Sequence, residues 1–169
     1  MFYIPLHYLD MACQAGYYLM VSNVLTGNIK NQRSGAYSKM TSEEMQILLS
    51  KSNNAIVGVN RAEGGPQLTP VWYAWDGAAF YFSTTKDRVK YANIKRDPDI
   101  TLIVDDFDMH KYVVAYGRAE IIEHNYGDLL RPVVSKYVPP DQVERSIKAV
   151  TDNPMRVLVV LRPDKIVTN

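Results

Sequence analysis

One pair of adjacent segments constrains the fold of this chain more than any other feature. Residues 67–75 and 78–84 are rich in β-branched and aromatic residues, and Asp76-Gly77 lies between them. Two such runs joined by Asp-Gly are a strong signal for a β-hairpin, because these residues accept the positive φ angles of a tight turn. Neither run alternates strictly between apolar and polar residues, so both faces of the hairpin need cover. We expect one face in a core and the other against a helix, a ligand or a second subunit.

Four further runs rich in apolar and β-branched residues predict strands. They span residues 55–60, 100–104, 112–122 and 155–161. Gly117 predicts a bulge or bend inside the third run, and Arg162-Pro163 is expected to end the fourth. Because the strands do not alternate regularly with helices, the pattern favours a mainly β fold with a few helices over a doubly wound sheet. The sequence therefore predicts a small, six-stranded antiparallel barrel, closed or partly closed.

Helix signals separate some of these runs. Thr41 predicts an N-cap, and Glu44 three residues later completes a capping box for a short helix. Three more helical stretches are expected, at residues 86–96, 126–138 and 142–150. Asp97-Pro98 should end the first of these three, because proline disfavours helix in the residue before it.

The first 39 residues differ from the rest of the chain, since they show no clear hydrophobic period. We therefore divide the chain into an extension, residues 1–39, and a folded domain, residues 40–169. Two interpretations of the extension stay open. Either Met40 is the true start of the protein, or the extension is genuine and packs on the core or on a partner.

Composition excludes several classes of protein. Nineteen Lys+Arg balance 18 Asp+Glu, so a generally basic surface for nucleic acid is not indicated. The single cysteine, Cys13, excludes an internal disulfide and a cysteine-rich zinc site. Asp105, Asp106 and Asp108 lack the spacing of a calcium loop, and we expect no metal. With no apolar run of about 20 residues and no signal peptide, we expect no membrane contact and a cytoplasmic location.

The segment after the predicted hairpin has the chemistry of an anion site. Ser83, Thr84 and Thr85 end a strand, and Arg88 and Lys90 follow at the start of a helix. The first amides of a helix are unsatisfied donors at the positive end of its dipole, and hydroxyls and cations add to them. This pattern predicts a site for one phosphate group. The alternative is that Thr85 merely caps a solvated, cation-rich helix.

A second candidate is the run Thr69, Pro70, Val71 and Trp72. Proline within a strand indicates a sheet edge or a bulge, and an edge leaves backbone N–H and C=O groups free. Free backbone groups beside aromatic rings can line a slot for a flat heterocycle. Ordinary aromatic core packing is the alternative interpretation.

Taken in order, these segments resemble the pyridoxamine 5′-phosphate oxidase-like split-barrel superfamily, over roughly residues 40–167. The resemblance rests on residues 65–73, Trp75-Asp76-Gly77, residues 80–85, Arg88 to Lys90, Asn93, residues 95–98 and Gly117 to Glu120. It is greatest to the branch of oxidoreductases that use the deazaflavin coenzyme F420. The resemblance implies a homodimeric, six-stranded split barrel with the cofactor in a groove at the subunit interface.

In this resemblance, the cofactor phosphate meets Ser83, Thr84, Arg88 and Lys90, and the backbone of residues 69–73 runs along the cofactor ring. It implies hydride transfer between F420 and a small unsaturated or heterocyclic substrate, with no identified catalytic side chain. Tyr112 is one candidate proton donor, and Lys86, Lys90 or Lys111 could meet the acidic tail of F420. An FMN enzyme of the same fold is an alternative, as is a non-catalytic carrier of flavin, F420 or haem. The short segment after the last strand argues against synthesis of pyridoxal phosphate.

Overall fold

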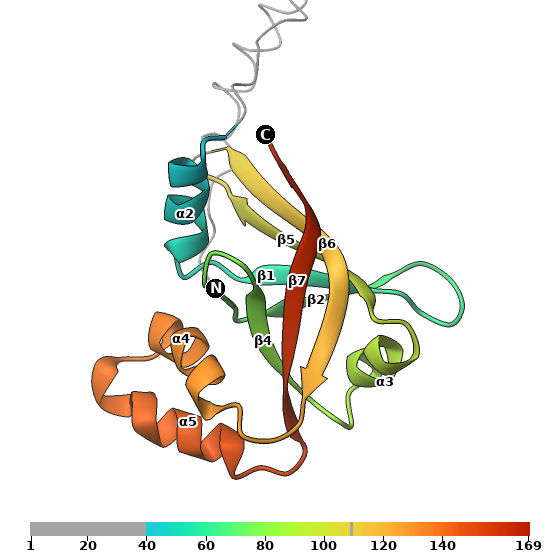
Figure 1. Ribbon diagram of the computed structural model, residues 1–169, viewed down its shortest axis with the longest axis vertical. Helices are drawn as coiled ribbons and strands as arrows, with labels where there is room; N and C mark the ends of the chain where they lie inside the picture. Colours follow the sequence, from blue (N-terminus) through green and yellow to red (C-terminus); the bar gives the residue numbers. More distant parts are fainter. Residues whose placement is uncertain (1–39, 109) are drawn as a thin grey trace, which may run out of the picture. The chain divides into compact units, whose positions relative to one another are not determined.

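The computed structural model describes residues 40–108 and 110–169, so the predicted extension lies outside the described residues. The described chain forms one antiparallel sheet with helices at its margins (Figure 1). The strands are β1 Ala55–Val59, β2 Gln67–Val71, β3 Ala74–Trp75, β4 Phe80–Thr85, β5 Asp99–Asp106, β6 Lys111–Ile122 and β7 Arg156–Thr168. The helices are α2 Ser42–Ser50, α3 Val89–Arg96, α4 Gly127–Tyr137 and α5 Val143–Thr151, with a 3-10 turn at Pro140–Gln142. The mainly β class with a few helices is confirmed.

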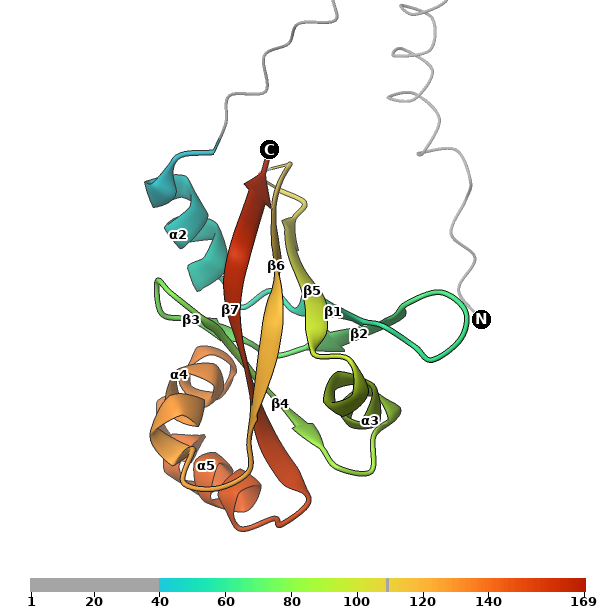
Figure 2. The same ribbon diagram turned by 45° about the vertical axis from the view of Figure 1, so that its right-hand side comes forward.

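The sheet curls because one segment of chain joins its two edges. Strands follow the order β2-β1-β5-β6-β7-β4-β3, so β2 and β3 lie at opposite ends. Only Trp72 and Tyr73 separate these two strands in sequence, so the two edges must lie close together. In Figures 1 and 2, β6 and β7 run along the length of the domain while β1 and β2 cross them steeply. The result is a half-barrel.

The predicted count of six strands was wrong, because residues 67–75 do not form one strand. The chain pairs with β1 as β2, turns away at Trp72, and pairs with β4 as β3. The predicted hairpin is confirmed: Trp75 pairs with Phe80, and Gly77 has a φ of 101° in the turn. The Asp76 carboxylate accepts hydrogen bonds from the backbone N–H groups of Ala78 and Ala79, both at 2.8 Å.

The first half of β7, residues 157–161, is covered on both faces. Val159 and Leu161 belong to a core cluster inside the curl of the sheet, where Tyr73, Phe80, Phe82 and Leu102 are also buried. Leu158 and Val160 point the other way and pack with residues of α4 and α5. A strand buried on both faces must be apolar at successive positions, which explains its lack of alternation.

The prediction that Arg162-Pro163 ends the last strand was wrong. β7 continues to Thr168 because the pairing with β6 shifts register beside Pro163, which lies opposite Gly117. At such an irregularity proline costs no ladder hydrogen bond. A Cβ at Gly117 would lie 2.6 Å from the backbone oxygen of Arg162, so the close approach requires glycine. The predicted irregularity at Gly117 is thereby confirmed.

The helices follow the predictions except at one start. The capping box of α2 is present, with Glu44 N–H donating to Thr41 Oγ1 at 3.1 Å and Thr41 N–H to Glu44 Oε2 at 2.8 Å. α3 begins at Val89 rather than at residue 86, because Thr85 is held in β4 by pairing with Arg156. Thr85 therefore does not cap this helix; Arg88 occupies the N-cap position. Within the described ranges, no helix is long and apolar enough to cross a membrane.

Candidate functional site

A cavity of about 690 Å³ lies between the start of α3 and the pair α4–α5, with β2, β4 and the start of β7 in its wall. Figure 2 shows α3 on one side of β4 and the two helices on the other. The volume falls in the range of small-molecule sites. All nine residues predicted to bind the cofactor phosphate or ring line this one cavity. They are Thr69, Pro70, Val71, Trp72, Ser83, Thr84, Thr85, Arg88 and Lys90.

A tight turn carries the chain from β4 into α3 and sets the cations beside the hydroxyls. Lys86 N–H donates to the Met155 carbonyl at 2.8 Å, and Arg88 N–H donates to the Thr85 carbonyl at 3.1 Å. Arg88 makes no side-chain cap to α3, and the first turn of that helix carries no acidic residue. The amides at the start of α3 are therefore not neutralised by a carboxylate of their own helix.

Lys90 is a buried cation without a counter-ion among the described residues. Lys90 is only 6% exposed, and its Nζ lies 5.6 Å from the centroid of the Phe82 ring. No carboxylate of a described residue forms an ion pair with it. Burial, together with the charge of Arg88, lowers the pKa of Lys90 to about 8. A buried charge is costly unless paired, so an anionic ligand would relieve a real cost here.

Arg156 is a third cation of the cavity, and the sequence did not point to it. It begins β7, and its Nη1 donates to Ser83 Oγ at 3.2 Å. The carboxylate near this cluster is Asp87. A hydrogen bond from Thr85, helped by the charges of Arg88 and Arg156, holds the pKa of Asp87 below its usual value. The pairing of β4 with β7 was the only signal that could have placed Arg156 here, because 73 positions separate it from Ser83.

The strand side of the cavity offers free polar groups. β2 is at an end of the sheet order, and its sheet partner is β1 alone. The Oγ1 atom of Thr69 is buried and has no hydrogen-bond partner among the described residues. Buried polar atoms are nearly always paired in folded proteins, so this hydroxyl suits a polar atom of a ligand.

The remaining wall is mostly apolar. Trp72 is 49% exposed and stacks on Tyr137, with ring centroids 4.9 Å apart and planes 3° from parallel. The helical pair contributes further apolar residues, which the sequence analysis missed: Leu130, Val133, Val134, Val138 and Val150. Their helical spacing shows in the sequence, but it could not tell a cavity wall from ordinary core.

Three residues considered for the site do not line the cavity. Lys86 pairs with Glu123 at 2.7 Å, and Lys111 pairs with Glu44 at 2.5 Å. Tyr112 lies on β6 opposite Asp105. Of the three lysines proposed for an acidic cofactor tail, only Lys90 faces this space.

Comparison with known proteins identifies the class. The chain belongs to the pyridoxamine 5′-phosphate oxidase family, whose model matches residues 41–169. The resemblance found in the sequence is therefore confirmed. This family has an oxidoreductase fold that binds flavins.

Solved structures with the same fold include proteins of several names. One is an F420 reductase, 28% identical with a TM-score of 0.56 over 72% of this chain and 94% of its own. A conserved hypothetical protein from Mycobacterium tuberculosis is 23% identical, with a TM-score of 0.67 over 76% of this chain and 84% of its own. General Stress Protein 26 from Bacillus anthracis is 17% identical, with a TM-score of 0.58 over 75% and 91% of the two chains. The last two likenesses concern the fold alone.

Proposed function

We propose that the protein is an oxidoreductase that holds coenzyme F420 in this cavity and transfers a hydride between F420 and a small unsaturated or heterocyclic substrate. The observation that carries this proposal is the set of three cavity cations, Arg88, Lys90 and Arg156, which form no ion pair among the described residues. Of the other cations among the described residues, seven pair with carboxylates and six do not, so what distinguishes these three is that they share one cavity. Cations left unpaired at one concave site favour an anionic ligand.

The donors of the cavity suit a phosphate. Arg88 can hold two phosphate oxygens at once, and Lys90 supplies a point charge. The hydroxyls of Ser83, Thr84 and Thr85 line the same cavity, and Arg156 is held toward Ser83. These residues would bind the phosphate group that F420 and FMN share.

The edge of β2 suits the cofactor ring. The backbone of residues 69–72 and the unpartnered Thr69 hydroxyl would face the polar edge of the ring, and the valines of α4 and α5 would exclude water. When bound, the cofactor supplies the hydride chemistry, while the protein binds and orients it. The 28% identity to an F420 reductase supports F420 over FMN.

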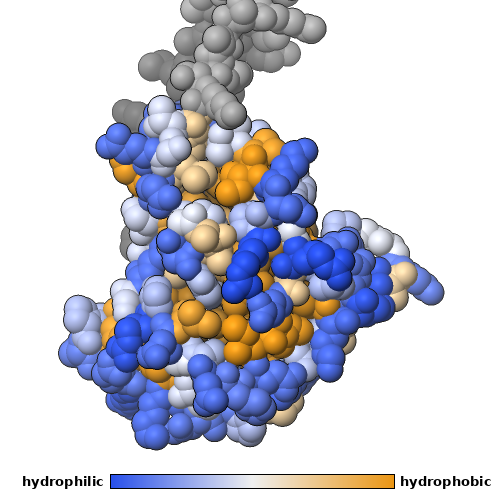
Figure 3. Space-filling view, viewed as in Figure 1, coloured by the Kyte–Doolittle hydropathy of each residue, from blue (hydrophilic) through white to orange (hydrophobic). Residues whose placement is uncertain are grey.

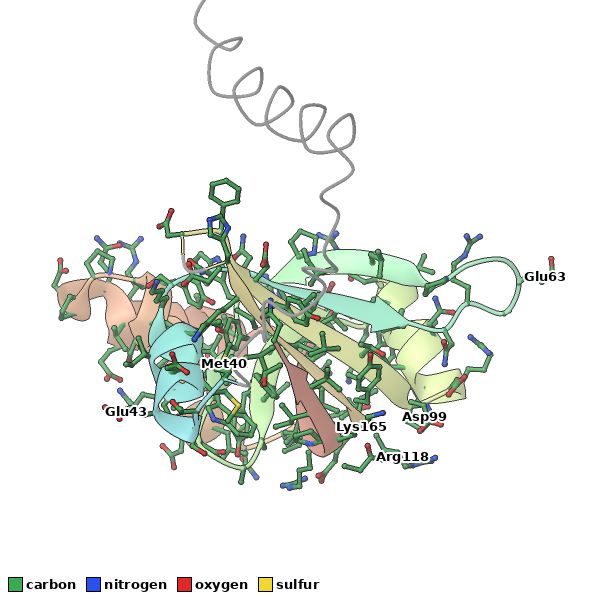
Figure 4. The ribbon with its side chains drawn as sticks, turned by 90° about the horizontal axis from the view of Figure 1, so that it is seen from above. Met40, Glu43, Glu63, Asp99, Arg118 and Lys165 are labelled. Carbon is green, nitrogen blue, oxygen red and sulfur yellow. The ribbon has the colours of Figure 1, made fainter. Side chains whose placement is uncertain are left out.

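The proposal includes a homodimer with the cofactor groove at the subunit interface. Apolar residues form one row across the outside of five paired strands: Pro70, Ile56, Ile103, Val114 and Val167. Beside this row Leu68 is 66% exposed, and Figure 3 shows apolar patches over β6 and β7 in an otherwise polar surface. Figure 4 shows Asp99, Arg118 and Lys165 together at one border of the sheet. An apolar face with charged borders is typical of a protein–protein interface. Sedimentation of a monomer at micromolar concentration would contradict the dimer.

The test is a pair of fluorescence titrations of the purified protein, one with F420 and one with FMN. We expect tight binding of F420 and weak binding of FMN. The reverse result would make the protein an FMN enzyme, to be assayed with oxygen and nicotinamide cofactors. Binding of neither would overturn the assigned chemistry. Bound F420 that stays reduced at the background rate across a broad panel of acceptors would make the protein a carrier.

A further inference from the structure

One face of the Trp72 ring stacks against the ring of Tyr137. The other ring of this stack belongs to Tyr137, whose hydroxyl takes part in two hydrogen bonds. Tyr73 N–H donates to Tyr137 Oη at 3.3 Å, and Tyr137 Oη donates to the Asn53 carbonyl at 2.7 Å. The nearly parallel stack therefore ties Trp72 to the end of α4 and to the segment before β1.

A lysine strengthens this support. Lys136 Nζ lies 3.4 Å from the centroid of the Tyr73 ring and donates to the Leu49 carbonyl at 2.8 Å. The Tyr73 hydroxyl donates to the same carbonyl at 3.1 Å. The last turn of α4, the end of α2 and the link between β2 and β3 are thus joined around Tyr137. A ring supported in this way loses little conformational freedom when a ligand stacks on it.

Trp72 borders the cavity and keeps part of its surface available to a ligand there. Trp72 remains 49% exposed although Tyr137 covers one face, and it lines the cavity together with the anion-binding residues. The backbone of residues 69–72 is already assigned to the cofactor ring, whereas the indole side chain has no assigned role. Aromatic rings prefer offset or edge contact with other flat π systems.

We infer that the indole of Trp72, positioned by Tyr137, is the stacking surface for the acceptor substrate, and that this substrate is a planar conjugated compound. The inference rests on the proposed function, because the cofactor must occupy the anion end of the same cavity. Trp72 is then a substrate-binding residue, and Tyr137 is a positioning residue that acts through it.

The test compares two probes of similar size, planar 2-naphthol and its saturated analogue decahydro-2-naphthol. Calorimetry measures each with protein to which F420 has been added, and F420 affinity is measured separately. We expect Trp72→Ala to weaken 2-naphthol binding about tenfold, the value of one aromatic stack, and to leave the saturated probe and F420 within about threefold. Trp72→Phe should retain most of the affinity. Tyr137→Phe should weaken 2-naphthol about threefold, because its ring remains but loses its hydrogen bonds.

Phe107→Ala is the matched control, since Phe107 is an aromatic side chain 81% exposed and outside the cavity. Unchanged 2-naphthol binding in Trp72→Ala, or an equal loss for both probes, would overturn the stacking role. Loss of F420 affinity with unchanged 2-naphthol binding would assign the indole to the cofactor instead. If the wild-type protein binds no F420, the proposed function fails, while the probe titrations without cofactor still decide whether Trp72 selects planar rings.

Discussion

Two helices of this domain begin in opposite ways. At the start of α2, Thr41 and Glu44 cap each other's backbone N–H groups, and Glu43 adds a second acid to the first turn. At the start of α3, Arg88 provides no side-chain cap, and no acid lies in the first turn. The positive end of α2 is neutralised within its own sequence, whereas that of α3 opens beside hydroxyls and cations of a cavity.

The neighbouring charges extend this contrast. A hydrogen bond from Lys111, followed by one from the Thr41 backbone, lowers the pKa of Glu44 to about 2, so the acid at α2 is fully ionised and paired. The pKa of Lys90 in α3 is lowered instead, because that cation is buried and lies near the charge of Arg88. A helix start that is complete needs no ligand. A start left incomplete, with unpaired cations around it, is suited to an anion from outside the chain.

The largest expected effect comes from removing both cations at the start of α3. Arg88→Ala with Lys90→Ala should weaken F420 binding roughly 100-fold or more, because each charge-assisted contact contributes about 1.5–3 kcal/mol. Fluorescence titration measures the loss. The control is Arg131→Ala with Lys148→Ala, which removes the same charge from exposed ion pairs outside the cavity. Equal affinity in the two double variants would refute the phosphate site.

A single substitution can make α3 begin as α2 does. Arg88→Asp places a capping carboxylate at the N-cap, which should raise the free energy of unfolding by about 1 kcal/mol. The same change should weaken F420 binding about 10–100-fold, through loss of the guanidinium contact. Urea unfolding measures the stability and cofactor titration measures the affinity. Arg88→Ala should weaken F420 binding without raising the free energy of unfolding. An Arg88→Asp variant that binds F420 normally would show that the open start of α3 does not contribute to cofactor binding.

The pH dependence of binding should report Lys90. Burial lowers the pKa of Lys90 to about 8, so this side chain loses its charge as the pH rises through 8. Affinity for a phosphate-bearing cofactor should therefore fall about tenfold between pH 7 and pH 9. Measuring Kd across this range tests whether the affinity falls as the pH rises. Lys90→Gln should bind more weakly at pH 7 and lose the lysine-linked part of the slope; an identical slope in the variant would assign the titration to another group.

The smallest effect is expected at α2. Thr41→Ala removes the cap and should lower the free energy of unfolding by about 1 kcal/mol, without changing F420 affinity. Chemical denaturation and the same titration check both statements. Thr41→Ser keeps the hydroxyl and should restore the stability. A loss of cofactor affinity in Thr41→Ala would mean that the start of α2 contributes to cofactor binding.

The sequence could group the predicted hydroxyls and cations because they are close together in the chain. Ser83 to Lys90 fall within eight positions, and so a strand end followed by a helix start fixes their proximity. The Asp76-Gly77 hairpin and the capping box at Thr41 could be predicted for the same reason. Whether these residues bind a cofactor stays a prediction.

The errors arise where pairing between distant segments overrides local preference. Residues 67–75 look like one strand, but the chain must pass from one sheet edge to the other at Trp72. Pro163 looks like a strand end, but a register shift opposite Gly117 accommodates it. Thr85 looks like a helix cap, but its partner Arg156 keeps it in β4.

The sequence by itself thus determined the family and the class of fold, since both follow from the order of segments along the chain, and the cluster of hydroxyls and cations, since Ser83 to Lys90 lie close together. Only the tertiary structure decided that Arg156 joins this cluster, that α4 and α5 wall the cavity, and that Tyr137 supports Trp72. Sequence patterns report which face of an element is apolar, but not which distant element will cover it. That choice depends on the curl of the whole sheet, which brings its two edges and the later helices to one place.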